Sequence, residues 1–318
     1  PPRSTLFPYT TLFRSESVKE ALIQSDICPR EKEFGDVMQE ITSDLLRVVE
    51  GKEDDYVAVL FGGSGTAAME ACVASLPEPG KKILIVENGA YGTRLRQIAE
   101  VYGIPVVPFI LPYGEFPDTR QIEQKLILEP EVSHIFVVHH ETTTGMLNPL
   151  EEIAQLAWKH GREVVVDAMS SLGGIPINVQ NTPYEYIISS ANKCLQGMPG
   201  LSFVICKKAN LLAAGKKRRS YYLDLPAQYL GFLNTHQMPF TPPVQIVYAL
   251  RQALREFFQE GQQGRYKRYQ ENFEILYRGL QNLGFRFLLP REQESGILLA
   301  VREIEHPAYS FEAMHDFL

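Results

Sequence analysis

Apolar runs of strand length alternate with helical patterns along most of this chain, and no other feature limits its fold as strongly. The runs are rich in valine, isoleucine and leucine, which is typical of strands that are buried on both faces of a parallel sheet. The alternation predicts an α/β fold with a mostly parallel sheet and helices on both faces. We expect strands at 56–61, 82–86, 106–110, 135–138, 163–166, 186–189 and 202–205, and helices at 33–49, 66–76, 92–102, 119–127 and 150–160.

The pattern changes after residue 243. Long helical patterns come first and shorter strands follow, at 244–259, 265–283, 285–289 and 296–301. We therefore expect a large domain over 16–243, and a linking helix with a smaller C-terminal α/β domain over 244–318. A further helix begins near residue 310, so close to the end that we expect the small domain to be truncated.

The first residues look foreign to the rest of the chain. Residues 5–15 read TLFPYTTLFRS, which resembles the translation of a sequencing-adapter oligonucleotide. We expect residues 1–15 to be a non-native segment and leave them out of the fold. A genuine N-terminal strand is the alternative.

Composition excludes several classes of partner. The net charge of −7, without a basic run, argues against nucleic acid and against a membrane surface. The apolar stretches are far too short to span a bilayer. The cysteines show neither a CxxC pair nor metal-ligand spacing, so we expect no metal site and a cytoplasmic protein with reduced thiols at Cys28, Cys72, Cys194 and Cys206.

A glycine-rich turn stands between a predicted strand and a predicted helix. Residues 62–68 read GGSGTAA, and the N–H groups at such a helix start suit a phosphate. The same residues fit GxGxxA, with Glu87 at the end of the next strand, so a dinucleotide-binding fold is a rival interpretation. A plain tight turn is the third possibility.

A carboxylate and a lysine follow two strands further along the chain. Asp167 ends the strand VVVD, and Lys193 follows the strand YIISS within the run Ala-Asn-Lys. Pyridoxal phosphate (PLP) chemistry needs this pair, because a carboxylate keeps the ring nitrogen protonated while a lysine binds the cofactor and moves protons. Alternatively, Asp167 caps a helix that starts at residue 168, and Lys193 is a surface lysine. Ser190 and Lys193 also fit S-x-x-K, but we find no companion motif of a serine acyltransferase.

These residues lie within motifs that resemble the class V aminotransferases of fold type I. The likeness runs in order from about residue 16 to the end, through 62–66, NGAYG at 88–92, HETTTG at 140–145, DAMSS at 167–171, SANK at 190–193 and TPP at 241–243. Within the family, residues 26–35 resemble the branch that acts on 2-aminoethylphosphonate and pyruvate rather than the alanine–glyoxylate branch. The resemblance implies PLP-dependent transamination by a homodimer.

The resemblance also implies a role for individual residues around the cofactor. Lys193 and Asp167 would be catalytic. The other cofactor contacts would be Ser64, Gly65 and Thr66 at the phosphate, Tyr91 stacked on the ring, Thr143 at the ring hydroxyl, Asn192 beside Lys193, and Thr241 reaching the phosphate of the neighbouring subunit. Tyr91 could instead pack as an ordinary helix-start residue, and Thr143 could stabilise its turn. His140 is either a supporting partner or a satisfied core histidine.

Substrate recognition is the least constrained part of this interpretation. A phosphonate dianion favours arginine, and Arg30 follows Pro29 at a predicted helix start, although it could equally pair with Glu31 or Glu33 on the surface. The family's N-terminal Thr-Pro-Gly-Pro-type segment is absent, and the C-terminal arginine for the substrate carboxylate would lie beyond Leu318. We therefore expect little activity from the chain as written. The alternatives are an alanine- or serine-glyoxylate aminotransferase and a non-catalytic nucleotide-binding module.

Overall fold

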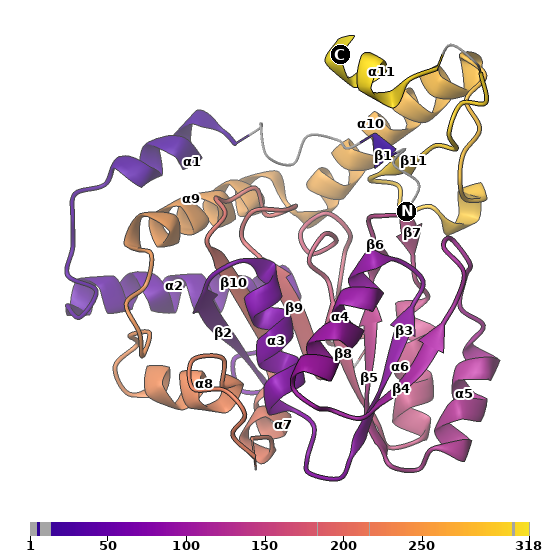
Figure 1. Cartoon of the computed structure of the whole chain (residues 1–318). Coiled ribbons are helices and arrows are strands. Elements are labelled where there is room, and N and C mark those ends of the chain that lie inside the picture. The colour runs from indigo at the N-terminus through magenta and orange to yellow at the C-terminus, as the bar shows by residue number, and fades with distance from the viewer. Residues whose placement is uncertain (1–4, 7–13, 183, 216, 307–308, 318) are drawn as a thin grey trace.

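The computed structural model describes residues 5–6, 14–182, 184–215, 217–306 and 309–317. Within this part of the chain, seven strands form the central sheet in the order β2-β10-β9-β8-β5-β3-β4 (Figure 1). Strand β10 runs antiparallel to both of its neighbours, and every other pairing is parallel. The strands are β2 (Tyr56–Gly62), β3 (Lys82–Glu87), β4 (Val106–Ile110), β5 (Val132–Val138), β8 (Glu163–Asp167), β9 (Tyr186–Ser190) and β10 (Leu201–Lys207).

Helices cover both faces of this sheet, as expected. Alternate residues along each strand join two different buried clusters, because successive side chains of a strand point to opposite faces. One face packs against α2 (Lys32–Val48), α5 (Thr119–Leu128), α6 (Leu150–Lys159) and α9 (Val244–Glu260). The other packs against α3 (Gly65–Ser75), α4 (Ala90–Val101), α7 (Lys208–Ala213) and α8 (Leu225–Leu233).

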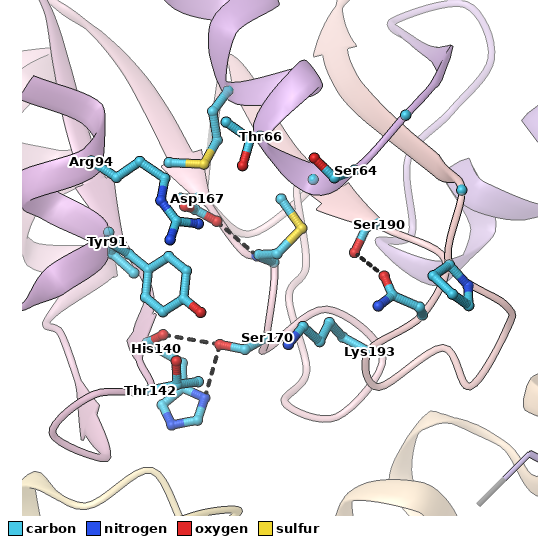
Figure 2. Close-up of a pocket in the computed structure, with 18 residues that line it drawn as sticks. Ser64, Thr66, Tyr91, Arg94, His140, Thr142, Asp167, Ser170, Ser190 and Lys193 are labelled. Atoms are coloured by element: carbon cyan, nitrogen blue, oxygen red, sulfur yellow. Dashed lines mark hydrogen bonds between the residues drawn. The ribbon is translucent and has the colours of Figure 1, made fainter. Parts of the chain in front are cut away.

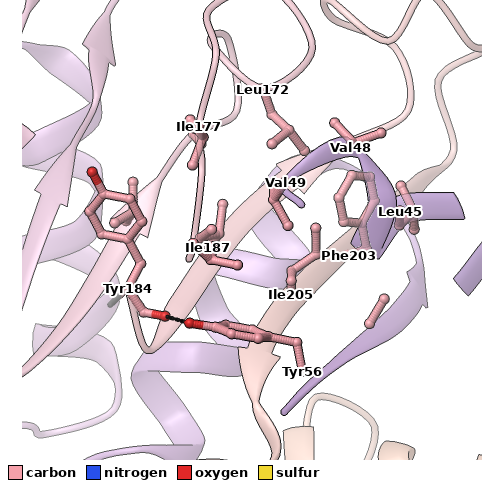
Figure 3. Close-up of a cluster of buried hydrophobic side chains, with 14 of the residues drawn as sticks. Leu45, Val48, Val49, Tyr56, Leu172, Ile177, Tyr184, Ile187, Phe203 and Ile205 are labelled. Atoms are coloured by element: carbon pink, nitrogen blue, oxygen red, sulfur yellow. Dashed lines mark hydrogen bonds between the residues drawn. The ribbon is translucent and has the colours of Figure 1, made fainter. Parts of the chain in front are cut away.

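The first of these clusters shows how the sheet is anchored. Leu45 and Val48 near the end of α2 meet Phe203 and Ile205 of the antiparallel strand β10 (Figure 3). At the margin of the cluster, the Tyr56 hydroxyl donates a hydrogen bond of 3.1 Å to the carbonyl oxygen of Tyr184. Apolar contact therefore holds this face, and the hydroxyl group of Tyr56 is satisfied by a backbone oxygen.

The C-terminal part has a small core of its own. Phe273 and Leu280 of α10 (Gln262–Asn282) pack with Leu299 of β11 (Leu299–Ala300), and Tyr277 stacks on Phe287 at 4.1 Å between ring centroids. The strand expected at 285–289 is only a single bridge between Phe287 and Val301, and the strand expected at 296–301 is reduced to β11. The 3-10 turn η2 (Arg291–Gln293) precedes β11, and α11 (Phe311–Phe317) follows it.

Part of the segment that we left out of the fold lies against it. Strand β1 (Thr5–Leu6) pairs antiparallel with β11. Because such pairing needs only backbone hydrogen bonds, any extended segment can form it. The buried Arg14 side chain donates to the backbone oxygens of Asn192 and Gly197, and Ser15 caps α1 (Glu16–Glu20), which leads into the turn η1 (Ala21–Ile23). Residues 1–4 and 7–13 of the segment expected to be non-native lie outside the described residues.

The topology brings the residues singled out in the sequence to one edge of the sheet. The carboxyl ends of β5, β8 and β9 meet there, beside the starts of α3 and α4 and the hairpin of β6 (His140–Glu141) and β7 (Met146–Leu147) (Figure 1). Parallel α/β folds bind their ligands at this edge. No helix in the described part of the chain is long and apolar enough to cross a membrane.

Candidate active site

A cavity of about 540 Å³ opens at this edge of the sheet (Figure 2). Backbone and side chains from five separate segments surround it, and most of the predicted cofactor residues are among them. The predicted residues that line it are Ser64, Gly65, Thr66, Tyr91, Asp167, Asn192 and Lys193. Arg94, His140, Thr142, Met169 and Ser170 line it as well.

Asp167 is the buried charge of the cavity. The residue is 2% exposed, and its Oδ1 accepts a hydrogen bond of 2.9 Å from the Met169 N–H. Oδ2 has no partner among the described residues. Burial raises the pKa of Asp167 to about 7, the Met169 N–H lowers it, the Glu141 charge raises it, and Arg94 lowers it. Residues 168–171 form a turn rather than a helix, so Asp167 does not cap a helix there.

A protonated pyridine nitrogen would supply the hydrogen-bond partner that Asp167 Oδ2 lacks among the described residues. A buried carboxylate oxygen without a partner is costly, and a cationic N–H group placed against it would supply both a hydrogen bond and a countercharge. The Asp167 carboxylate therefore fits the ring nitrogen of PLP.

Lys193 follows β9 and enters the cavity from the side opposite Tyr91. Its amino group points toward the Ser170 hydroxyl (Figure 2). The loop that carries it is closed by backbone hydrogen bonds, Gln196 N–H to the Lys193 oxygen at 2.9 Å and Gly197 N–H to the Ala191 oxygen at 2.8 Å. Lys193 is therefore held at the cavity rather than being a free surface lysine.

The S-x-x-K alternative does not fit this loop. The Ser190 hydroxyl donates to Asn192 Oδ1 at 2.9 Å. A serine nucleophile would instead need its hydroxyl hydrogen to face a base. The Asn192 side chain is fixed by this contact at the cavity wall.

The glycine-rich turn forms the end of the cavity next to α3. Gly63 has a φ of +148°, which strongly favours glycine, and its N–H bonds the Gly200 oxygen at 2.9 Å. No side chain in the described part of the chain caps the start of α3, so the N–H groups of Gly65 and Thr66 remain available to a ligand. A Cβ on Gly65 would lie 2.3 Å from Met169 Sδ, so a larger residue at this position would collide with the Met169 side chain. The turn thus fits a phosphate at a helix N-terminus.

The dinucleotide-fold alternative is wrong for this turn. The turn follows β2, which lies at the edge of the sheet and, among the described strands, pairs with the antiparallel strand β10 alone. A dinucleotide fold would place it on a parallel strand at a topological switch point. Glu87 does not face the cavity either, because its carboxylate accepts hydrogen bonds of 2.8 Å from Thr93 and from Arg96.

Some predicted residues lie away from the cavity. The Thr143 hydroxyl donates to Glu141 at 2.6 Å, and its neighbour Thr142 lines the cavity instead. Thr241 is exposed on the segment before α9. Arg30 is exposed, and it donates to the backbone oxygens of Met238 at 2.7 Å and Pro239 at 3.4 Å rather than pairing with a neighbouring glutamate.

His140 is a buried wall residue. Ser170 Oγ lies 3.0 Å from the His140 backbone oxygen and 3.1 Å from its Nδ1. Burial lowers the pKa of His140 to about 3, so the ring is neutral. Its Nε2 has no partner in the described part of the chain.

Several wall residues were not assigned a role from the sequence. Arg94 lies one helical turn beyond Tyr91, with its guanidinium carbon 4.8 Å from the tyrosine ring centroid, and the i, i+3 spacing was the available signal. Ser170 lies within the motif at 167–171, three residues after Asp167. Among the described residues, no group of three or more histidine, cysteine, aspartate or glutamate side chains could hold a metal ion.

A known protein family matches the sequence of this chain. A family model described as aminotransferase class V matches residues 16–311. The chain belongs to the class V aminotransferases. The family implies PLP as the cofactor, as expected from Asp167 and Lys193, and it rules out the nucleotide-binding module.

Curated relatives cover nearly the whole chain. The 2-aminoethylphosphonate–pyruvate transaminase of Klebsiella pneumoniae subsp. pneumoniae is 42% identical over 98% of this chain and 84% of its own length. The enzyme of the same name from Vibrio vulnificus is 41% identical over 96% of this chain and 83% of its own.

Solved structures agree on the fold. The alanine–glyoxylate aminotransferase of Nostoc sp. superposes with a TM-score of 0.88 at 30% identity, covering 98% of this chain and 82% of its own. The ureidoglycine–glyoxylate aminotransferase of Bacillus subtilis gives a TM-score of 0.87 at 24% identity, covering 100% and 81%. The expected fold type I architecture is therefore confirmed.

Proposed function

We propose that the protein transfers the amino group of 2-aminoethylphosphonate to pyruvate, which gives phosphonoacetaldehyde and alanine. The observation that carries this proposal is the name shared by the curated relatives, which are 41–42% identical over at least 96% of the chain. The likeness of residues 26–35 to this branch supports the same choice of donor.

The proposed chemistry uses Asp167 and Lys193 as the catalytic pair. When bound, PLP supplies a protonated ring that accepts the electron pair released as the substrate loses the proton beside its amino group. Asp167 Oδ2 keeps the proton on the ring nitrogen. Lys193 Nζ would hold the cofactor covalently between turnovers, and its free amine would carry the proton that the substrate loses. In the second half-reaction pyruvate would receive the amino group, and Lys193 would move the proton in the opposite direction.

The remaining wall residues hold the cofactor in this proposal. Ser64, Gly65 and Thr66 bind its phosphate at the start of α3, and Tyr91 stacks on its ring. Thr142 replaces Thr143 as our choice for the ring-hydroxyl edge, because Thr142 lines the cavity and the Thr143 hydroxyl is engaged with Glu141. Asn192 flanks Lys193.

We also propose a cytoplasmic homodimer in which Thr241 reaches the phosphate of the neighbouring subunit. Thr241 is exposed, and the nearby Tyr221 is 73% exposed beside Phe240, at 5.8 Å between ring centroids. Arg30 holds the backbone at Met238 and Pro239, just before Thr241, so we assign it to that segment rather than to the phosphonate. All four cysteines are free thiols, which supports the cytoplasm.

The test of the proposed function compares donors and acceptors one half-reaction at a time. We expect the PLP-loaded protein to react with 2-aminoethylphosphonate at least about 100-fold more efficiently than with L-serine, and its aminated form to prefer pyruvate to glyoxylate. Stopped-flow absorbance of the bound cofactor measures both steps, and Lys193→Ala gives the background. A preference for serine or glyoxylate would move the protein to the glyoxylate branch.

A further inference from the structure

A side chain from another loop caps helix α4, which carries Tyr91. The N-cap of the helix is Gly89, which has no side chain to offer. Instead, the Ala90 N–H donates to Thr143 Oγ1 at 3.2 Å, and the N–H groups of Tyr91 and Gly92 donate to Glu141 Oε2 at 3.1 and 3.4 Å. The first three N–H groups of α4 are thus all satisfied by residues 141–143. A carboxylate at this position also interacts favourably with the helix dipole.

The second oxygen of Glu141 fastens the loop itself. Oε1 accepts the Thr143 hydroxyl at 2.6 Å and the Thr143 N–H at 3.3 Å. Because Thr143 Oγ1 accepts from Ala90, its own hydrogen is directed to Glu141. Glu141 is fully buried, which raises its pKa, while these donors act in the opposite direction. Every hydrogen-bond partner of this carboxylate among the described residues is a donor, and these donors favour its ionised form against the cost of burial.

Close packing against Glu141 requires a glycine at position 89. A Cβ on Gly89 would lie 2.2 Å from Glu141 Cγ, so only glycine lets the side chain approach the helix so closely. Gly89 has a φ of −176°, an extended conformation that any residue adopts, and the requirement is therefore purely steric. The sequence NGAYG at 88–92 and the glutamate at 141 form one unit in space.

We propose that Glu141 is a positioning residue that fixes two walls of the cofactor site, the Tyr91 ring and the Thr142 side chain. Tyr91 N–H bonds the carboxylate directly, and Thr142 lies between the two residues that form the cap. Glu141 itself does not line the cavity, so it acts through these neighbours. The inference rests on the proposed stacking role of Tyr91.

Glu87 offers a matched control. It is also a buried glutamate that contacts α4, where it accepts hydrogen bonds of 2.8 Å from Thr93 and from Arg96. These two residues lie about one helical turn beyond the capped N–H groups, and Glu87 faces away from the cavity. Glu141→Gln keeps the size of the side chain and turns one acceptor into a donor that faces other donors. Glu87→Gln makes the same change without touching the cap.

The measurement is the dissociation constant of pyridoxamine 5'-phosphate for cofactor-free protein, by equilibrium dialysis, with the melting temperature of each variant recorded alongside. This probe needs no bond to Lys193. We expect about tenfold weaker binding for Glu141→Gln, the scale of one charge-assisted hydrogen bond, and less than about twofold for Glu87→Gln. Thr143→Val removes the hydroxyl group that accepts from the Ala90 N–H and donates to Glu141, and it should weaken binding by about threefold. This variant replaces Glu141→Gln in the test if Glu141→Gln fails to fold.

A double-mutant cycle decides whether Glu141 acts through Tyr91. In a Tyr91→Leu background, Glu141→Gln should weaken binding by no more than about twofold, since the Tyr91 ring is gone and only the effect through Thr142 remains. Equal effects of Glu141→Gln and Glu87→Gln, or full additivity with Tyr91→Leu, would overturn the inference alone. Unchanged binding by Tyr91→Leu would instead remove Tyr91 from the proposed cofactor site, and the inference with it.

Discussion

Replacing Lys193 with alanine is expected to remove both turnover and the covalent attachment of PLP. Lys193 is the lysine that lines the cavity, and it carries two tasks in the proposed cycle, attachment of the cofactor and transfer of the substrate proton. Loss of a positioned general base costs about 10²–10⁴-fold in rate, and loss of the attachment step adds to this, so we expect kcat to fall by at least about 10⁴-fold. Steady-state kinetics with 2-aminoethylphosphonate and pyruvate measure this loss.

Borohydride reduction followed by peptide mass spectrometry locates the attachment site. The parent protein should carry the reduced cofactor on Lys193, and Lys193→Ala should carry none. Lys82→Ala is the control, because Lys82 begins β3 at the other end of the strand from the cavity and pairs with Glu129 at 2.6 Å. Labelling of another lysine in the parent would contradict the assignment of Lys193.

Asp167→Asn is expected to keep PLP bound while turnover falls by about 10³-fold, the cost of removing one key charge-stabilising group. The asparagine oxygen can still accept from the Met169 N–H, but its amide then presents a donor to the ring nitrogen. The proton on that nitrogen is lost, and the ring withdraws electrons poorly. Absorbance measures the PLP content, and kcat measures the loss. Full activity would show that Asp167 does not contact the ring.

The same variant should stabilise the cofactor-free protein at high pH. Burial raises the pKa of Asp167 from an unfolded value near 3.8 to about 7, so the folded state binds more protons across this window. Stability therefore falls as the pH rises from about 4 to about 7, and Asp167→Asn removes this loss. We expect the variant to gain on the order of 3 kcal/mol more over the parent at pH 8 than at pH 5, in urea unfolding. An equal difference at both pH values would contradict the raised pKa.

The strands of the sheet were largely predictable because buried strands carry an apolar signal along their whole length. The strand at 106–110 has the bounds of β4, and the run at 163–166 lacks only Asp167 of β8. The direction of β10 was not predictable, since pairing depends on partners far away in sequence. Its apolar run reads the same in a parallel or an antiparallel ladder.

Helix α8 shows where the periodicity signal fails. Its sequence, LPAQYLGFL, is apolar on most sides and contains a proline and a glycine, so it has no helical stripe. The structure starts it at a cap that the sequence does carry, with Asp224 accepting from the Ala227 N–H at 3.0 Å. In the C-terminal part, the expected strand at 285–289 has only one bridge to a partner, and strand propensity alone does not supply more.

The site was predictable only as far as strand ends and motifs reach. Asp167 and Lys193 follow neighbouring parallel strands, so their meeting at the cavity follows from topology. Whether Thr142 or Thr143 faces the cavity depends on the turn geometry, which cannot be read from the sequence motif. The role of Glu141 depends on its contact with a helix some fifty residues away in sequence, and no local pattern reveals such a contact.

Phosphorus NMR of one reaction mixture tests the central proposal most directly. Purified protein loaded with PLP is incubated with 2-aminoethylphosphonate and pyruvate, and alanine is assayed in the same sample. We predict that the phosphonate signal shifts to that of phosphonoacetaldehyde, that one alanine forms for each molecule converted, and that conversion beyond the amount of enzyme requires pyruvate. An unchanged phosphonate signal, in protein that still converts another amino donor with pyruvate to alanine, would contradict the proposed function.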